Sequence, residues 1–490
     1  MKTKTKDKTG QASICEACQA CDGTRCAALQ KDAKAFLKES LPEEISQNYP
    51  GMRFTADAMD CAMPIAIDSH SGCSFACLYC FSNSFVRDPS RNTGIMKEAV
   101  DKHGLYRQTS LRALERLFAR DADNEYARAV YPLLDMGQPI QWGALGEPFD
   151  KLEELTGWGL KFAKILRKYN VPTRVSTKGA ECLLKPKYLK AFRGSDRFWF
   201  NFSFISANDK LLTRVDLGAP DATTRYKAMK ALHKDGHRVG IRFRPFIPGV
   251  SDQWPGEPKG WAVHLEKCRE AGCESISFEF IFFERGANAR QRAQYQLIAR
   301  AARDPNLVRD YIEDSLSFGT CIRRNRAWKY DMTMAIREKC HELGMAFCVS
   351  DPHFKEFGDT ECCCGFPDDD PIWGKTDRHN CCSQVVRARK RYEKGERPVL
   401  LTFDEVCPDW ARVVKAGTMI NFSCAANHRR RRDQTWGDTL RNKWNNPNHA
   451  RAPYYYFEGI LRPHHVDENK DIVYEYVPYD NRKDIKSRLV

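Results

Sequence analysis

Between residues 61 and 284 the sequence alternates between short apolar segments and longer segments with helical spacing, which constrains the fold more than any other feature. Six segments have the composition of buried β-strands, at residues 63–68, 139–145, 171–178, 197–205, 237–247 and 274–283. Helical spacing is found between them at residues 110–120, 151–169 and 221–236. Strands that alternate with crossover helices form a parallel sheet. The sequence therefore predicts an α/β fold, a partial (β/α)6 barrel with its active site at the carboxyl ends of the strands.

The loop after the first of these strands carries three cysteines, Cys73, Cys77 and Cys80, with Tyr79 just before the last. A cluster of four irons held by three cysteines keeps one iron without a protein ligand, whereas clusters that only transfer electrons normally have a full set of thiolates. An open iron can bind a small molecule and deliver an electron to it. The spacing therefore favours an iron–sulfur cluster that takes part in chemistry. A zinc knuckle with a distant fourth ligand is the alternative.

Polar residues follow the next predicted strands. Gly146, Glu147 and Pro148 come just after the second strand, and Ser176 and Lys178 lie two apart at the end of the third. The glycine allows a ligand to approach the backbone, and the carboxylate can pair with the ammonium group of an amino acid ligand. The fourth and fifth strands carry polar side chains spaced by two, which indicates a lined cavity: Asn201, Ser203, Arg242 and Arg244.

The stretch from residue 211 to residue 252 makes a family resemblance specific. The chain resembles radical S-adenosylmethionine (SAM) enzymes of the group that contains spore photoproduct lyase. Besides the three cysteines and the Gly-Glu pair, the matching positions are Asp216, Gly218, Pro220, Arg225, Gly236, Pro245, Pro248, Gly249 and Asp252. The resemblance covers about residues 61–284.

The resemblance implies a 4Fe–4S cluster on Cys73, Cys77 and Cys80, with SAM bound at the open iron and cleaved to a 5′-deoxyadenosyl radical. Glu147 would hold the SAM ammonium group and Lys178 its carboxylate. The full set of expected SAM-binding residues is Tyr79, Gly146, Glu147, Pro148, Ser176, Lys178, Ser203 and Arg244. No residue is assigned a catalytic role.

The sequence departs from the lyases at two places. The lyases carry a hydrogen-donor cysteine a few residues before the carboxylate motif, but residues 142–145 contain no thiol here. Phe81 follows the third cysteine, where the lyases have a tyrosine. These two differences argue against the DNA-repair reaction of the lyases, whereas the resemblance still implies a nucleic-acid base as the substrate, for modification or repair.

Further cysteines form two groups outside the predicted barrel. Cys15, Cys18, Cys21 and Cys26 have spacing close to a ferredoxin run and are expected to bind an auxiliary Fe–S cluster or zinc, or to remain free of metal. The second group is a further candidate metal site: Cys348, Cys362, Cys363, Cys364, Cys381 and Cys382. The 21 cysteines are odd in number and clustered, which favours metal ligands in a reducing compartment over disulfide bonds.

Charge points to a polyanionic partner. The formal net charge is +14, and residues 381–450 contribute 14 basic and 7 acidic residues to it. Four consecutive arginines, residues 429–432, are followed by Trp436, Trp444 and an aromatic run at 454–457. Arginines neutralise phosphates and aromatic rings stack on bases, so this region would suit nucleic acid. A charged loop beside an aromatic core is the alternative.

Four segments are expected: a cysteine-rich N-terminal segment 1–60, a barrel 61–290, a helical and cysteine-rich auxiliary metal region 291–400, and a basic aromatic region 401–490. The polar, lysine-rich N-terminus has no secretory h-region, and no apolar run reaches the ~18 residues of a membrane span. A cytoplasmic location without membrane contact is therefore expected.

The sequence as a whole predicts a radical SAM enzyme that abstracts hydrogen from a nucleic-acid base and receives electrons from a reductant such as flavodoxin or ferredoxin. Two alternatives remain open. One is a peptide-modifying radical SAM enzyme with auxiliary clusters, and the other is a non-catalytic, zinc-bound nucleic-acid-binding protein.

Overall fold

The computed structural model describes residues 47, 51–55, 61–75, 77–80, 107–284, 287, 289–313, 321–324, 326–415, 434–449 and 452–482. Two sequence-based expectations lie outside the described residues. They are the N-terminal metal site on Cys15, Cys18, Cys21 and Cys26, and the arginine run at 429–432.

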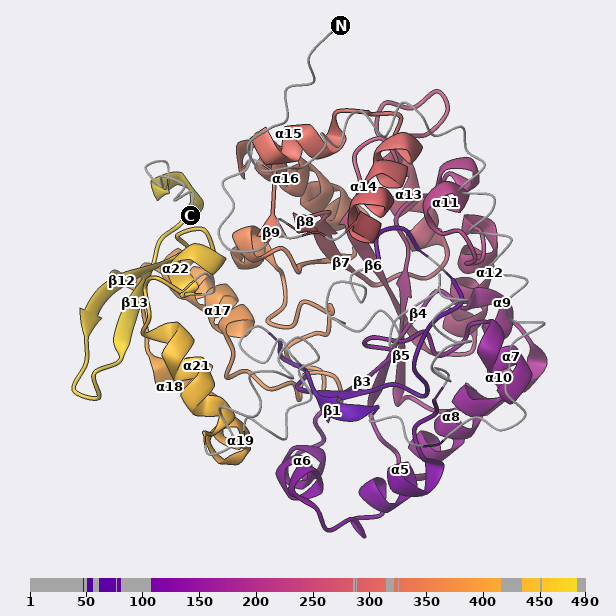
Figure 1. Cartoon of the computed structure of the whole chain (residues 1–490), viewed down its shortest axis with the longest axis horizontal. Coiled ribbons are helices and arrows are strands. Elements are labelled where there is room, and N and C mark those ends of the chain that lie inside the picture. Colours follow the sequence, from indigo (N-terminus) through magenta and orange to yellow (C-terminus); the bar gives the residue numbers. More distant parts are fainter. Residues whose placement is uncertain are drawn as a thin grey trace, which may run out of the picture.

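A sheet of eight strands forms the centre of the molecule (Figure 1). In spatial order its strands are β1 (Met52–Phe54), β2 (Ile65–Ile67), β3 (Ile140–Trp142), β4 (Thr173–Thr177), β5 (Phe198–Ser203), β6 (Arg238–Phe246), β7 (Ser275–Phe280) and β10 (Ala346–Val349). From β2 to β10 every neighbouring pair is parallel, and only β1 runs antiparallel, against β2. The six predicted strands are confirmed as β2 to β7, and the parallel order confirms the predicted α/β class.

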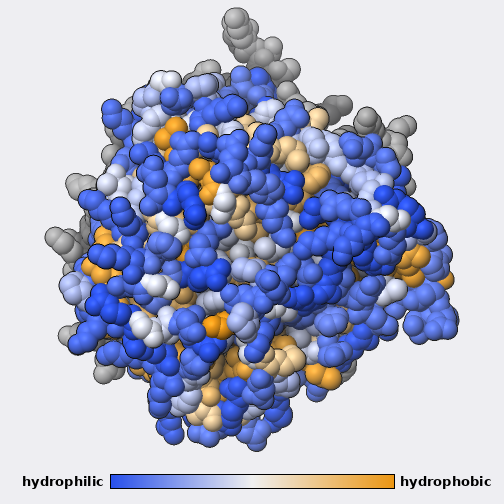
Figure 2. All heavy atoms as spheres, turned by 180° about the vertical axis from the view of Figure 1, so that it is seen from behind, coloured by the Kyte–Doolittle hydropathy of each residue, from blue (hydrophilic) through white to orange (hydrophobic). Residues whose placement is uncertain are grey.

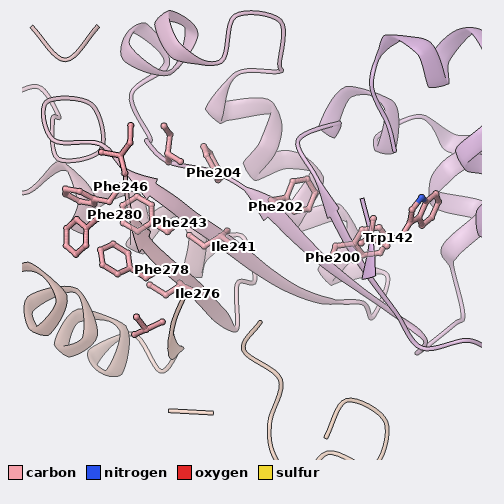
Figure 3. Close-up of a cluster of buried hydrophobic side chains, with 14 of the residues drawn as sticks. Trp142, Phe200, Phe202, Phe204, Ile241, Phe243, Phe246, Ile276, Phe278 and Phe280 are labelled. Atoms are coloured by element: carbon pink, nitrogen blue, oxygen red, sulfur yellow. The ribbon is translucent and has the colours of Figure 1, made fainter. Parts of the chain in front are cut away.

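The two faces of the sheet differ because side chains alternate along each strand. In β5, Phe198, Phe200 and Phe202 are buried on one face. Figure 3 shows Phe200 and Phe202 in a cluster with apolar side chains of β6 and β7. Trp199 and Asn201 alternate with them and are also buried. The apolar face is covered by helices, and the opposite, polar face is the concave face of the partial barrel.

Nine helices of the described chain accompany this sheet up to residue 270, and most of them surround its outer side (Figure 1). They are α5 (Leu111–Phe118), α6 (Glu125–Asp135), α7 (Lys151–Thr156), α8 (Trp158–Lys168), α9 (Ala180–Leu183), α10 (Pro186–Phe192), α11 (Asp209–Val215), α12 (Ala222–Lys234) and α13 (Gly260–Glu270). Side-chain caps fix several starts: Ser110 accepts from the backbone N–H of Ala113, and Asp221 from that of Thr224.

The single helix expected at 151–169 is in fact two helices, α7 and α8, which meet at Gly157. Gly157 has φ of 60°, in the left-handed region where glycine has no steric penalty. The sequence pattern missed the break because apolar spacing continues across it.

The chain beyond residue 290 contributes to the central sheet as well as to a second layer. Here the helices are α14 (Ala289–Ala301), α15 (Leu307–Glu313), α16 (Arg326–Glu342), α17 (Cys381–Glu393), α18 (Phe403–Val406), α19 (Asp409–Val413), α21 (Trp436–Trp444) and α22 (Pro453–Tyr456). Short 3-10 helices lie at Pro352–Phe357 and Tyr479–Asn481. Strand β10 pairs with β7, so the central sheet draws on residues on both sides of the boundary expected at 290.

Two small sheets complete the fold. β11 (Leu400–Leu401), β13 (Ile472–Tyr476) and β12 (Leu461–Val466) form an antiparallel sheet, seen at the left of Figure 1. β8 (Phe283–Glu284) and β9 (Cys321–Ile322) form an antiparallel pair. No helix in the described ranges has the length and apolar content that a membrane crossing requires.

The expectation that Trp436 and Trp444 stack on bases is wrong, because both side chains are buried. The Trp444 ring N–H donates to the carbonyl of Ile472, and Tyr474 donates its hydroxyl proton to the carbonyl of Trp444. The Trp444 ring therefore belongs to the core under the small C-terminal sheet, and the Trp436 ring is likewise a buried core side chain. On the face opposite to that of Figure 1, the surface is mostly hydrophilic with scattered small hydrophobic patches (Figure 2).

Candidate active site

The candidate site lies at the carboxyl-terminal edge of the parallel sheet. The cysteine loop follows β2, Glu147 follows β3, Lys178 follows β4, Ser203 ends β5, and Arg244 lies near the end of β6. Because parallel strands end at the same edge, the topology brings residues from five strands to one side of the sheet.

Backbone contacts fix the cysteine loop at several points. The Ser74 N–H donates to the Asp150 carboxylate at 2.8 Å, and Asp150 also caps helix α7. The Leu78 N–H donates to the carbonyl of Val215 at 2.8 Å, and the Gly218 N–H donates to that of Phe75 at 2.8 Å. The loop is therefore held between the start of α7 and the end of α11.

Tyr79 is tied to a buried ion pair. Its hydroxyl donates to Asp216 at 2.5 Å, and the other oxygen of Asp216 accepts from Arg225 at 2.7 Å. Asp216 and Arg225 are 1% and 0% exposed. Burial acts to raise the pKa of Asp216, but Lys178 and Arg225 hold it below its usual value. The family resemblance named Asp216, Gly218 and Arg225. In the structure these three residues hold the cysteine loop in place.

A side chain at position 218 would not fit. A Cβ atom there would lie 2.7 Å from the carbonyl oxygen of Ser74 and 3.2 Å from the backbone of Phe75. The absence of a side chain allows the turn after α11 to lie against the cysteine loop.

Cys77 is buried, whereas Cys73 and Cys80 are half-buried. Burial raises the pKa of the Cys73 and Cys77 thiols well above the usual value. Within the described ranges no group of three or more His, Cys, Asp or Glu side chains is already arranged as a metal-ion ligand set. The donor chemistry nevertheless fits an iron–sulfur cluster, since one loop at the carboxyl edge of the sheet carries three sulfur donors.

Glu147 is buried and largely committed to the protein. One carboxylate oxygen accepts from the Phe149 N–H at 3.1 Å and from the Thr177 hydroxyl at 2.5 Å, and the other accepts from the Lys178 N–H at 2.8 Å. A carboxylate has about four accepting positions, so about one remains for a ligand. Burial raises the pKa of Glu147 to about 7, despite these three hydrogen bonds. Its affinity for a proton, and for a cation, is therefore high for a carboxylate.

Lys178 lies beside the cysteine loop. Its ammonium group is 5.0 Å from the centre of the Tyr79 ring. Burial acts to lower the pKa of Lys178, but the neighbouring Cys77 and Asp216 raise it above its usual value. Ser176 is buried and accepts from Arg242 at 3.0 Å. Ser176 lies in β4 and Lys178 directly after it, two residues apart, so the strand geometry places both on one face.

The remaining expected SAM-binding residues have structural partners of their own. The Gly146 N–H donates to Asp68 at 3.1 Å, and Pro148 lies against Gly143. The Ser203 carbonyl accepts from Arg225 at 2.9 Å. Arg244 donates to the Ser350 hydroxyl and lies 3.9 Å from Glu279.

The second cysteine group is brought together only in part. The Cys364 thiol interacts with the thiols of Cys362 and Cys363, and Cys363 interacts also with Cys382. Cys348 instead lies 3.3 Å from the hydroxyl of Thr360. Hydrogen bonds from Cys362 and Cys363, reinforced by Arg174, hold the pKa of Cys364 well below that of an ordinary thiol.

Sequence reasoning missed Cys61, Arg174 and Gln141, which belong to the surroundings of that group. The Arg174 guanidinium donates to the Cys364 sulfur at 2.7 Å and to Gln141 at 2.8 Å, and Gln141 donates to the Cys61 sulfur at 3.2 Å. Arg174 could have been singled out from the sequence, because it is a charged residue inside the predicted buried strand 171–178, where side chains are normally apolar.

Comparison with known proteins gives matches among solved structures only, since neither a protein-family model nor a curated protein matches the sequence. The chain is similar to a spore photoproduct lyase mutant with bound AdoMet and dinucleoside spore photoproduct, at a TM-score of 0.43 and 13% identity, over 68% of this chain and 95% of that one. It is also similar to Streptococcus suis SuiB bound to S-adenosylmethionine, at a TM-score of 0.30 and 11% identity, over 65% and 72% of the two chains. A third similar structure is the cobalamin-dependent S-adenosylmethionine radical enzyme OxsB, at 0.27 and 13%, over 48% and 30%. These neighbours include the enzyme group named by the sequence resemblance.

Proposed function

We propose that this chain is a cytoplasmic radical SAM enzyme whose catalytic 4Fe–4S cluster is held by Cys73, Cys77 and Cys80. When bound, the cluster and SAM would supply a 5′-deoxyadenosyl radical that abstracts hydrogen from the substrate. One observation carries the proposal: a loop with only three cysteines is fixed by Asp150 and Asp216 at the carboxyl edge of a parallel sheet, next to Glu147 and Lys178.

In this proposal the protein binds the amino acid part of SAM by charge. Glu147 accepts a hydrogen bond from the ammonium group through the position that its protein partners leave open. Lys178 pairs with the carboxylate. The buried position of Glu147 and the half-buried position of Lys178 strengthen both contacts relative to water. Tyr79, fixed by Asp216, keeps the cysteine loop in place.

Anaerobic reconstitution with iron and sulfide, followed by dithionite and SAM, tests this function. The proposal expects 5′-deoxyadenosine as a product. A protein that contains only zinc and makes no 5′-deoxyadenosine would instead be the non-catalytic alternative.

Glu147 gives a prediction for pH. A carboxyl group with a pKa of about 7 is mostly protonated at pH 6 and mostly ionised at pH 8, and only the ionised form attracts an ammonium group. We expect SAM affinity to fall about tenfold for each pH unit below 7. Above about pH 8 the affinity should fall again as the SAM ammonium group loses its proton. Isothermal titration calorimetry across this range measures the bell-shaped profile.

In Glu147→Gln the SAM affinity should no longer fall at low pH, because the carboxyl group that takes up the proton is gone. The fall in affinity above about pH 8 should remain, because it comes from the ammonium group of SAM. The groups that act on Glu147 are the Thr177 hydroxyl, the backbone N–H groups of Lys178 and Phe149, and the Asp150 carboxylate, and all of them remain in this variant. Glu181→Gln changes an exposed carboxylate and serves as the control. An unchanged low-pH limb in Glu147→Gln contradicts the assignment.

We further propose a nucleic-acid base as the site of hydrogen abstraction and a flavodoxin or ferredoxin as the reductant. The formal charge of +14 supports a polyanionic substrate.

Single-stranded DNA or RNA is therefore expected to raise the rate of 5′-deoxyadenosine formation. The enhancement should weaken as salt rises from 50 to 200 mM, since phosphate contacts release counterions. The rate is measured by chromatography with DNA, RNA or mixed peptides at equal concentration. Stimulation by peptides together with no effect of DNA or RNA would contradict the nucleic-acid assignment.

A further inference from the structure

Five thiols from three separate segments of the chain meet at the concave face of the sheet. We call them the inner thiol cluster: Cys61, Cys362, Cys363, Cys364 and Cys382. Cys362 and Cys364 are buried in a small core with Trp199 and Trp373, and Cys61 and Cys363 pack against the same core. The loop after β10 thus inserts its cysteines into the partial barrel, away from the loop that follows β2.

Arginines face this cluster from the strands. Arg174 of β4 is 2% exposed, and its charged group donates to the Cys364 sulfur at 2.7 Å. Arg242 of β6 donates to the hydroxyl of Ser176 at 3.0 Å, and its Nε is buried without a hydrogen-bond partner. Burial, together with Arg244 and Arg174, lowers the pKa of Arg242, and the sulfur atoms of Cys364 and Cys363 oppose this shift.

Neither Arg174 nor Arg242 has a carboxylate within ion-pair distance in the part of the chain that the structure describes, whereas Arg244 lies 3.9 Å from Glu279. Taking an unpaired charge out of water costs several kcal/mol. Two guanidinium groups therefore require about two negative charges nearby, and the sulfur atoms are the remaining candidates.

A single thiolate at Cys364 supplies only one of these charges, whereas a metal site can supply both. Four thiolates around Zn²⁺ carry two net negative charges, and so do four thiolates on an oxidised 4Fe–4S cluster. Either group would balance Arg174 and Arg242 together. Disulfide bonds would remove the thiolates and leave both arginines without a counter-charge.

We propose that the inner thiol cluster is a four-thiolate metal site, for zinc or an Fe–S cluster, whose charge is balanced by Arg174 and Arg242. The sulfur atoms pack against one another in this structure, so a metal would have to enter between them. The site differs from the sequence-based group because it includes Cys61 and does not need Cys348, which lies beside Thr360. It is independent of the catalytic cluster.

The test uses the full-length chain with the other candidate ligands removed by alanine at positions 15, 18, 21, 26, 73, 77 and 80. We expect this base variant, purified anaerobically, to retain about one zinc ion or about four iron and four sulfide ions per chain. Adding Cys362→Ala, Cys363→Ala and Cys364→Ala should remove the metal. Elemental analysis gives the content, and the visible absorption spectrum distinguishes iron from zinc.

Cys182→Ala in the base variant is the matched control, because Cys182 is a buried thiol of helix α9 outside the cluster. Arg174→Gln should lower the metal content while circular dichroism stays unchanged. A folded base variant without metal overturns the proposal, and so does metal that survives the loss of residues 362–364. If the base variant does not fold, the same three alanines are placed in the wild-type chain, where the loss of about one zinc or about four irons is expected and unchanged content contradicts the proposal.

The catalytic cysteines are absent from the base variant, so this result does not depend on radical chemistry. Metal content and 5′-deoxyadenosine formation are measured separately. The two measurements therefore distinguish an active radical enzyme without metal in the inner thiol cluster from an inactive protein with metal in that cluster.

Discussion

Replacing Cys73, Cys77 and Cys80 together by alanine is expected to abolish 5′-deoxyadenosine formation. The loop supplies the sulfur donors proposed for the catalytic cluster, and no other described cysteine follows β2 within this loop. Without the cluster SAM has no source of the electron that cleaves it. Product formation after anaerobic reconstitution should fall below detection, and iron content should fall at the same time.

Cys182→Ala is the control for this experiment, because it removes a buried thiol from an outer helix and leaves the loop intact. It should retain both iron and product formation. A triple variant that still makes 5′-deoxyadenosine would show that the cluster lies elsewhere.

Asp216→Asn is expected to have the largest effect on stability. Asp216 is the carboxylate partner of Arg225, and both side chains are almost fully buried. Removing one partner of a buried ion pair leaves an uncompensated charge and destabilises a protein by about 3–5 kcal/mol. Urea unfolding should show this loss, and the same variant should bind less catalytic iron, since Tyr79 loses its anionic acceptor.

Asp123→Asn removes the partner of Arg128 from an exposed ion pair, with side chains 64% and 86% exposed for Arg128 and Asp123. Its expected effect is about 0–1 kcal/mol. The double variant Asp216→Asn/Arg225→Met should be more stable than Asp216→Asn alone, since it removes the buried guanidinium that Asp216→Asn leaves without its carboxylate. Equal unfolding midpoints for Asp216→Asn and Asp123→Asn would contradict the role given to the buried pair.

Much of the barrel could be predicted because its apolar strand segments alternate regularly with segments of helical spacing. Alternation in the segment that became β5 identified both the strand and its two faces. β10 was not predicted, since Ala346–Val349 is a short apolar run inside a cysteine-rich segment, and only its pairing with β7 makes it part of the sheet. The break at Gly157 depends on backbone conformation rather than on apolar spacing.

The candidate site was less predictable than the fold. The order of strands indicated that Glu147 and Lys178 lie at one edge, because each follows a parallel strand. The sequence did not indicate that the Glu147 carboxylate is nearly saturated by the protein. It also gave no reason to place Cys61 beside residues about three hundred positions later, since such proximity arises only when the loop after β10 enters the barrel. Trp436 and Trp444 were misread because aromatic residues look alike in a core and on a binding surface.

The open iron is the central claim, and electron paramagnetic resonance tests it most directly. The sample is the chain with alanine at positions 15, 18, 21, 26, 362, 363 and 364, reconstituted and reduced, so that Cys73, Cys77 and Cys80 hold the remaining cluster. The account predicts that SAM shifts the signal of the reduced cluster, because the ligand binds the iron that has no protein donor. A signal that SAM leaves unchanged, or zinc in place of iron, would contradict the account.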